Sequence, residues 1–298
     1  MKAMALTTLS ILALAGCASQ SPHQEAAHPQ ATDKGHEHAA ATDESMARQR
    51  ANLVANTDGK GFGPQAPRDL NSAMGTNPVA FTMAPPFSQM NLCNIHFHKN
   101  AEHKGGEFTT YVGHGDGQGY GTGFKYNGVL SAAEMRPSSR QACPSAHGAL
   151  QVGDTLEVHY VFSTATVQPG PTLGACLNDA TKNPELRVEA QTIVLVNDAN
   201  AYDFVKLAQV GVINGRQQAP GMLNNSGSPI QYTGSTTGPA FNEAGSPFQV
   251  SWSVRPRVAK VNIDSVASWC EGNVFKEDHA HGVRTLVTEP KLLSTINR

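Results

Sequence analysis

Two histidines separated by a single residue, His96 and His98, have a spacing that suits metal binding. In a β-strand alternate side chains point to the same face, so the two imidazoles project side by side and Phe97 projects to the opposite face. A catalytic zinc site has three protein ligands, often imidazoles, and keeps a fourth position open. The spacing therefore predicts two of the three ligands of a metal site, and the third must come from elsewhere in the chain.

The third ligand is expected on a second strand that faces the same space. His159 lies within residues 154–162, a run of β-branched and aromatic residues that predicts a strand. Glu157 precedes it by two residues and shares its face, where a carboxylate can accept the other ring N–H of a ligating histidine. From the residues alone, His103 and His114 are alternative third ligands.

The remainder of the chain predicts a mainly β fold. Its 28 glycines and 18 prolines favour many turns, and helix-type patterning is scarce. Further strands are expected at residues 105–112, 192–196 and 248–254, whereas residues 201–212 fit either a helix or a strand and residues 263–269 fit a short helix. We expect one domain around a large, mostly antiparallel, twisted β-sheet with short peripheral helices and long loops.

The first fifty residues have the features of an export signal and a tether. A short apolar run ends in Leu14-Ala15-Gly16-Cys17, which resembles a bacterial lipobox, so residues 1–16 are expected to be a signal peptide and Cys17 the lipidated N-terminus. Residues 17–50 lack large apolar side chains and are expected to be a disordered tether to the domain at 51–298. The chain is thus expected to be an exported, periplasmic or outer-membrane-anchored bacterial lipoprotein, in contact with the membrane only through its lipid.

Histidines recur in the tether, at positions 23, 28, 36 and 38. They fit either metal capture or a polar spacer, and a disordered segment gives them little fixed geometry. The sequence leaves both alternatives open.

Four cysteines remain after Cys17 is set apart: Cys93, Cys143, Cys176 and Cys270. An even number in an exported protein predicts one or two disulfides. Four cysteines allow three pairings, and the sequence does not choose among them.

Charge excludes one class of partner. The net charge is -2 and only 15% of the residues are charged, with no basic stripe or lysine-rich run. Such a chain is not expected to bind nucleic acid.

Read together, four blocks resemble the α-type carbonic anhydrases in the same order along the chain. They are His96-Phe97-His98 with Glu102-His103, Leu156-Glu157-Val158-His159, the loop Tyr232–Pro239, and Val250-Ser251-Trp252. The gap between the first two blocks is long, and the four cysteines and a glycine-rich insert are unusual for that class. These departures are similar to the δ class of carbonic anhydrases. The resemblance covers residues 90 to 255 in patches.

This resemblance implies an α-carbonic-anhydrase-like catalytic domain and a carbon–oxygen lyase that hydrates carbon dioxide reversibly to bicarbonate and a proton. Zn²⁺ would be held by the three histidines, with Co²⁺ or Cd²⁺ as substitutes. Thr237 would accept a hydrogen bond from a zinc-bound hydroxide and donate its own proton to Glu102. An apolar substrate pocket would be lined by Val161, Val250 and Trp252. His114 is our candidate for moving the proton to solvent, because an ordinary histidine titrates near neutral pH.

Two other functions remain open at this stage. The chain could be a non-catalytic, carbonic-anhydrase-like lipoprotein that binds metal or a partner, or a different zinc hydrolase with a wider pocket. Thr237 and Glu102 favour the lyase, since a metal store needs neither residue. The oligomeric state is not indicated.

Overall fold

A computed structural model describes residues 41–57, 82–181, 184–237, 245–283 and 286–296. The chain divides into two compact units, Met1–Glu37 and His38–Arg298, and all described residues belong to the second. The predicted signal peptide, Cys17 and most of the predicted tether lie outside the described residues, and they stay predictions.

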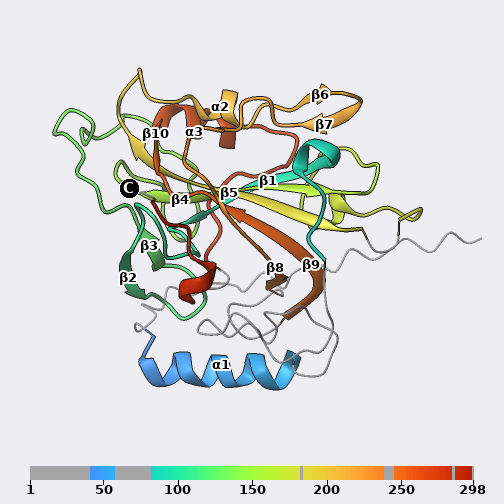
Figure 1. The fold of residues 1–298 in the computed structure, drawn as a ribbon. Helices are drawn as coiled ribbons and strands as arrows, with labels where there is room; N and C mark the ends of the chain where they lie inside the picture. Colours follow the sequence, from blue (N-terminus) through green and yellow to red (C-terminus); the bar gives the residue numbers. More distant parts are fainter. Residues whose placement is uncertain (1–40, 58–81, 182–183, 238–244, 284–285, 297–298) are drawn as a thin grey trace, which may run out of the picture. The chain divides into compact units, whose positions relative to one another are not determined.

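A six-stranded sheet is the centre of the second unit (Figure 1). Its strands are β1 (Asn91–Lys99), β4 (Thr155–Ser163), β5 (Leu186–Val196), β9 (Gly245–Val254) and β8 (Ile230–Thr237) in that spatial order, with β10 (Ala259–Asn262) also paired to β5. The pairs β1/β4, β4/β5 and β8/β9 are antiparallel, whereas β9 and β10 both run parallel to β5. The prediction of a mainly β fold is confirmed, and the sheet is mixed.

The two parallel pairings come from one stretch of chain that follows the same edge of β5. Strand β9 pairs with the first half of β5, Leu186–Ala190, and β10 pairs with its last residues, Ile193–Val196. Residues 255–258 connect β9 to β10, and the backbone N–H of Arg255 donates to the Ala190 carbonyl of β5 at 3.2 Å. The local sequence does not specify this arrangement, because the pairing of β9 and β10 depends on the edge of β5 that β4 leaves open.

Short elements surround the sheet. Two hairpins are formed by β2 (Thr110–His114) with β3 (Thr122–Lys125) and by β6 (Gly211–Ile213) with β7 (Arg216–Gln218). The helices are α1 (Asp43–Thr57), α2 (Phe204–Leu207) and α3 (Ile263–Cys270), with 3-10 turns η1 (Phe87–Gln89), η2 (Leu173–Cys176) and η3 (Pro290–Leu292). None of the helices in the described part of the chain is both long and apolar enough to cross a membrane.

Several expected elements have different bounds in the structure, and β5 and β9 begin before the predicted residues 192 and 248. The strand predicted at 105–112 starts only at Thr110, because Gly105 and Phe108 pair with each other in a tight turn and Gly106 has a positive φ of 44°. The ambiguous segment 201–212 contains the short helix α2 and the start of β6.

Helix α1 begins at Asp43, within the segment predicted to be a disordered tether. Thr42 and Ser45 exchange side-chain to backbone hydrogen bonds of 3.0 and 3.2 Å, which satisfy N–H groups at the helix start. Met46 is buried in an apolar cluster, and Gln49 Nε2 donates to the Gly117 carbonyl at 2.7 Å. These distant contacts explain why residues of unremarkable composition are helical here.

The central sheet buries both of its faces in different apolar clusters. Phe97, Tyr160 and Ile193 lie on one face, together with the apolar residues of α2 and α3. Val161 and Val188 lie on the other, together with those of β8 and β9. The alternation of side chains along β1 and β4 therefore places His96, His98 and His159 on the second face.

Two disulfides select one of the three possible pairings. Cys93 on β1 is bonded to Cys176 at the end of η2, and Cys143 is bonded to Cys270 at the end of α3. The prediction of one or two disulfides is thus met at its upper limit.

Candidate metal centre

The three histidines predicted as ligands lie together on neighbouring strands. His96 and His159 are direct partners in the antiparallel pair of β1 and β4, and His98 is two residues further along β1. One ligand nitrogen from each ring can be chosen so that all three lie within 4.8 Å of one another. In the described part of the chain, this is the only group of three or more such residues that could hold a metal ion.

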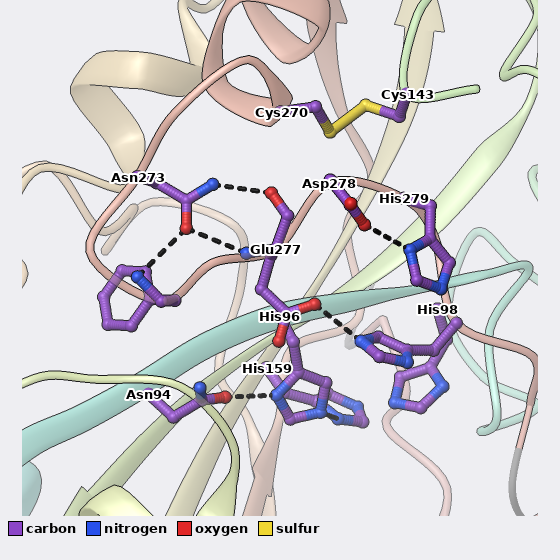
Figure 2. Close-up of polar contacts among 12 residues, drawn as sticks. Asn94, His96, His98, Cys143, His159, Cys270, Asn273, Glu277, Asp278 and His279 are labelled. Atoms are coloured by element: carbon purple, nitrogen blue, oxygen red, sulfur yellow. Dashed lines mark hydrogen bonds and ion pairs between the residues drawn. A yellow bond between two sulfur atoms is a disulfide. The ribbon is translucent and has the colours of Figure 1, made fainter. Parts of the chain in front are cut away.

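Hydrogen bonds fix the orientation of the two histidines on β1. His96 Nδ1 lies 2.6 Å from Asn94 Oδ1 (Figure 2), and His98 Nδ1 lies 2.8 Å from the carbonyl oxygen of Gly282. Both partners are acceptors, so each Nδ1 carries the proton and each Nε2 keeps a lone pair. A ligating histidine uses this arrangement to present one defined nitrogen to a metal.

Glu157 orients the third histidine and also organises its surroundings. Its Oε1 accepts from His159 Nε2 at 3.0 Å and from His103 Nδ1 at 2.7 Å. Its Oε2 accepts from the backbone N–H groups of Glu102 and His103 at 2.7 and 3.2 Å. His159 Nδ1 therefore faces the cluster, whereas His103 is fully buried and its Nε2 accepts from the Tyr232 hydroxyl.

The pKa values of two buried groups favour a neutral His98 beside an ionised Glu157. Burial lowers the pKa of His98 to about 4, although the Glu102 carboxylate opposes this shift. For Glu157, burial would raise the pKa, but the hydrogen bonds and charges of His103 and His159 hold it well below its usual range. At neutral pH His98 is therefore unprotonated, which is the form that binds a metal.

The predicted pair of Thr237 and Glu102 is only partly described. Glu102 is buried, with Oε1 3.8 Å from His98 Nδ1. The backbone of Thr237 lies at the end of β8, opposite Gly245 of β9, but its side chain lies outside the described residues. The hydrogen bond expected between the two side chains stays a prediction.

The residues predicted to form an apolar pocket lie on the same face of the sheet as the histidines. Val161 follows His159 by two residues on the same face of β4, and Val250 and Trp252 belong to the same buried cluster. The Trp252 ring lies 5.2 Å from the His159 ring, measured between centroids. An apolar wall thus borders one side of the cluster.

His114, the predicted proton carrier, contacts other residues. Its Nδ1 lies 2.6 Å from the Tyr111 hydroxyl and its Nε2 lies 2.6 Å from Asp43 Oδ1 on α1. It lines a cavity of about 430 Å³ with side chains from α1, β2, β3 and the C-terminal segment. The structure does not group His114 with the three histidines of the sheet.

A fourth histidine near the cluster was missed by the sequence analysis. The His281 ring lies 5.7 Å from the His96 ring and 5.8 Å from the His98 ring. The available signal was a second His-x-His spacing, His279-Ala280-His281, directly after Glu277 and Asp278. The residues around this second His-x-His spacing have no strand pattern, so no metal ligand was predicted there.

Comparison with known proteins gives a family and a set of solved structures. A family model described as delta carbonic anhydrase matches residues 87–265. Similar solved structures include an alpha carbonic anhydrase from Aspergillus oryzae (16% identity, 47% of this chain and 55% of that one, TM-score 0.24). Another is an alpha carbonic anhydrase from Thermovibrio ammonificans, in complex with sulfanilamide (13% identity, 70% and 77% covered, TM-score 0.24). The chain thus matches about half the length of the fungal protein, and no curated protein matches it significantly.

Proposed function

Since the chain belongs to the delta carbonic anhydrase family, we propose that it catalyses the zinc-dependent, reversible hydration of carbon dioxide to bicarbonate and a proton. The observation that carries this proposal is the convergence of one nitrogen from each of His96, His98 and His159. The family assignment confirms the predicted resemblance to the δ class of carbonic anhydrases.

The donor set fits zinc. Three neutral imidazoles, each held at its other nitrogen by an acceptor, are typical of catalytic zinc sites. Co²⁺ and Cd²⁺ are expected to occupy the same nitrogens, because imidazole does not discriminate strongly among these ions. A zinc ion held there would supply a Lewis acid that lowers the pKa of a bound water to about 7.

The surrounding side chains have separate roles in this proposal. Glu157 keeps His159 in the tautomer that presents Nδ1. Val161, Val250 and Trp252 exclude water and offer an apolar surface to carbon dioxide, which is itself apolar. Thr237 donates its hydroxyl proton to Glu102, so that the Thr237 oxygen is left as an acceptor that orients the attacking water. His114 is hydrogen-bonded to Tyr111 and Asp43 apart from the three histidines, so no proton-transfer role is proposed for it.

The location of the enzyme is proposed from its N-terminal sequence. We infer export, lipidation at Cys17, a tether that ends before α1, and attachment to the periplasmic face of a bacterial membrane. Two disulfides support export, because they persist in oxidising compartments. Cys17→Ser is expected to move the protein from the membrane fraction to the soluble fraction after expression in a bacterial host.

Stopped-flow measurement of proton release on mixing with carbon dioxide tests the activity. The zinc-loaded chain should accelerate hydration, a chelator should abolish the acceleration, and zinc should restore it. His159→Ala should lose both zinc and activity, whereas His147→Ala, an exposed histidine outside the cluster, should lose neither. Stoichiometric zinc without acceleration would refute the lyase and support a non-catalytic metal-binding lipoprotein.

A further inference from the structure

The C-terminal segment that carries His279 and His281 is paired to the strand of the metal centre. The backbone N–H of His281 donates to the Phe97 carbonyl at 2.9 Å, and its carbonyl accepts from Lys99 N at 2.9 Å. His281 is thereby the parallel bridge partner of His98 on β1. Because paired residues in a sheet project to the same face, the His281 ring lies beside the three predicted ligands.

Each of these two histidines is oriented by a neighbouring carboxylate. Asp278 Oδ1 lies 2.5 Å from His279 Nδ1 (Figure 2), and Glu277 Oε2 lies 2.6 Å from His281 Nε2. In the neutral rings, His279 Nε2 and His281 Nδ1 therefore keep lone pairs. Metal-binding histidines commonly have such a carboxylate partner.

The histidines form a graded series from solvent to the buried cluster. The side chain of His279 is 37% exposed, that of His281 28% and that of His98 6%. The centroids of the His279 and His281 rings are 5.3 Å apart, and the His281 ring lies 5.7 Å from that of His96. An ion that enters along this series can change imidazole partners in short steps.

Contacts hold the loop in place without any metal. Asn273 Nδ2 donates to the Glu277 carbonyl at 2.7 Å, and Asn273 Oδ1 accepts from the backbone N–H groups of Phe275 and Glu277 (Figure 2). The disulfide between Cys143 and Cys270 fixes the end of α3, from which the loop starts (Figure 2). The histidine pair is therefore positioned before an ion arrives.

We propose that His279 and His281, with Glu277 and Asp278, form a transient cation site that captures a divalent metal ion and passes it to the metal centre. The inference rests on the proposed metal centre of His96, His98 and His159. Among the described residues only that centre brings three ligand atoms within 4.8 Å, so the loop offers fewer ligands and the ion moves inward. The two carboxylates raise the local concentration of cations, as charged clefts do.

Metal uptake by the metal-free full-length chain tests the proposal. The rate is measured by stopped flow, from the absorbance of Co²⁺ on binding or from competition between Zn²⁺ and a fluorescent indicator. His279→Ala should slow uptake about tenfold, within the range by which charged clefts raise association rates. It should slow release to a chelator by the same factor, because a removed route leaves the equilibrium affinity unchanged. Asp278→Asn should give a smaller decrease, which added salt should diminish.

Matched variants distinguish the uptake of metal through the loop from its stable binding at the metal centre. His147→Ala removes an exposed histidine stacked on Tyr120 and should leave the uptake rate unchanged. His159→Ala should abolish stable binding while the loop is intact. Thermal unfolding of each metal-free variant checks that it is folded. Wild type and every variant keep the histidines of the first forty residues, so these histidines contribute equally to all measured rates.

Unchanged uptake in both His279→Ala and Asp278→Asn would overturn the proposal. A weaker equilibrium affinity with an unchanged uptake rate would also overturn it, because it would make His279 a ligand of the final site. A wild-type chain that binds no ion would refute both loading and the proposed metal centre. A chain that loads metal through the loop without hydrating carbon dioxide would refute only the proposed enzyme.

Discussion

At His98, burial has a consequence for the pH dependence of stability. The pKa of its ring is lowered from 6.5 to about 4 in the folded, metal-free chain. The unfolded chain therefore binds a proton below pH 6.5 that the folded chain resists. Stability is fully present above pH 6.5 and is lost as the pH falls to about 4. A shift of this size corresponds to roughly 3 kcal/mol of unfolding free energy.

Urea unfolding of the metal-free chain between pH 7 and pH 4 measures this loss. His98→Asn provides the comparison, because it removes the titrating ring. The pKa of Glu157 is also depressed, but its contribution is lost only as the pH falls below about 4.5, the ordinary value for a glutamate. An equal loss of stability in wild type and variant between pH 6.5 and 4.5 would show that His98 is not the source.

Glu157 is a single carboxylate that serves four donors, so a near-isosteric change should be costly. Glu157→Gln replaces one acceptor oxygen by an N–H₂ group that faces either the two imidazole donors or the two backbone donors. Zinc affinity is expected to fall about 10- to 100-fold, as it does when a partner of a ligating histidine is lost. Competition titration with a chelating dye measures this.

Glu134→Gln is the control for that prediction, because its carboxylate pairs with Lys260 at 2.6 Å away from the histidines. It should leave zinc affinity unchanged. If Glu157→Gln binds zinc as tightly as wild type, Glu157 does not determine the orientation of His159.

Among the strands, β1 and β4 show what the local sequence determines. The prediction of a strand at residues 154–162 differs from β4 by one residue at each end, and the alternation along β1 placed His96 and His98 on one face. The local sequence does not determine the register between β1 and β4. A shift between Leu92 and Asn94 sets the phase that pairs His96 with His159. Such irregularities depend on contacts between strands and cannot be read from one strand's sequence. His159 was therefore predicted from its strand pattern, from the neighbouring Glu157 and from the family resemblance, and not from the register.

The two faces of β1 should separate stability from metal binding. Phe97 is buried on the face opposite the histidines, with ring centroids 5.6 Å from Phe204 and 5.5 Å from Trp269. Phe97→Ala should lower the free energy of unfolding by about 3–5 kcal/mol, because it leaves a cavity among α2 and α3. Chemical denaturation of the metal-free protein measures this cost.

His96→Ala supplies the reciprocal measurement on the other face. It should abolish tight zinc binding and change the stability of the metal-free chain less than Phe97→Ala does. A Phe97→Ala protein with wild-type stability but lost zinc binding would contradict this division of β1.

For the molecule as a whole, contacts that are remote in sequence are the least predictable part. The composition predicted a mainly β fold and an upper limit of two disulfides, and both agree with the structure. The carbonyl of Gly282 that orients His98, and the bridge between His98 and His281, join positions more than 180 residues apart. No local pattern marks Gly282, because a backbone carbonyl carries no side-chain signature, and the His-x-His spacing of His279 and His281 does not indicate their pairing with β1. Helix α1 was missed for the same reason, since its stability comes from tertiary contacts.

The two disulfides tie these remote segments together, and their loss should be felt across the whole fold. Cys143 and Cys270 are 127 residues apart and Cys93 and Cys176 are 83 apart, so each closes a long loop in the unfolded chain. Replacing either pair by serines should lower the free energy of unfolding by about 2–5 kcal/mol.

Loop entropy alone makes the disulfide that closes the longer loop only about 0.4 kcal/mol more stabilising than the other. A much larger loss for Cys143→Ser/Cys270→Ser in denaturant titrations would therefore mean that this bond also stabilises folded contacts, those of α3 and the loop to His281. Equal stability of wild type and both double variants would show that neither bond constrains the unfolded chain.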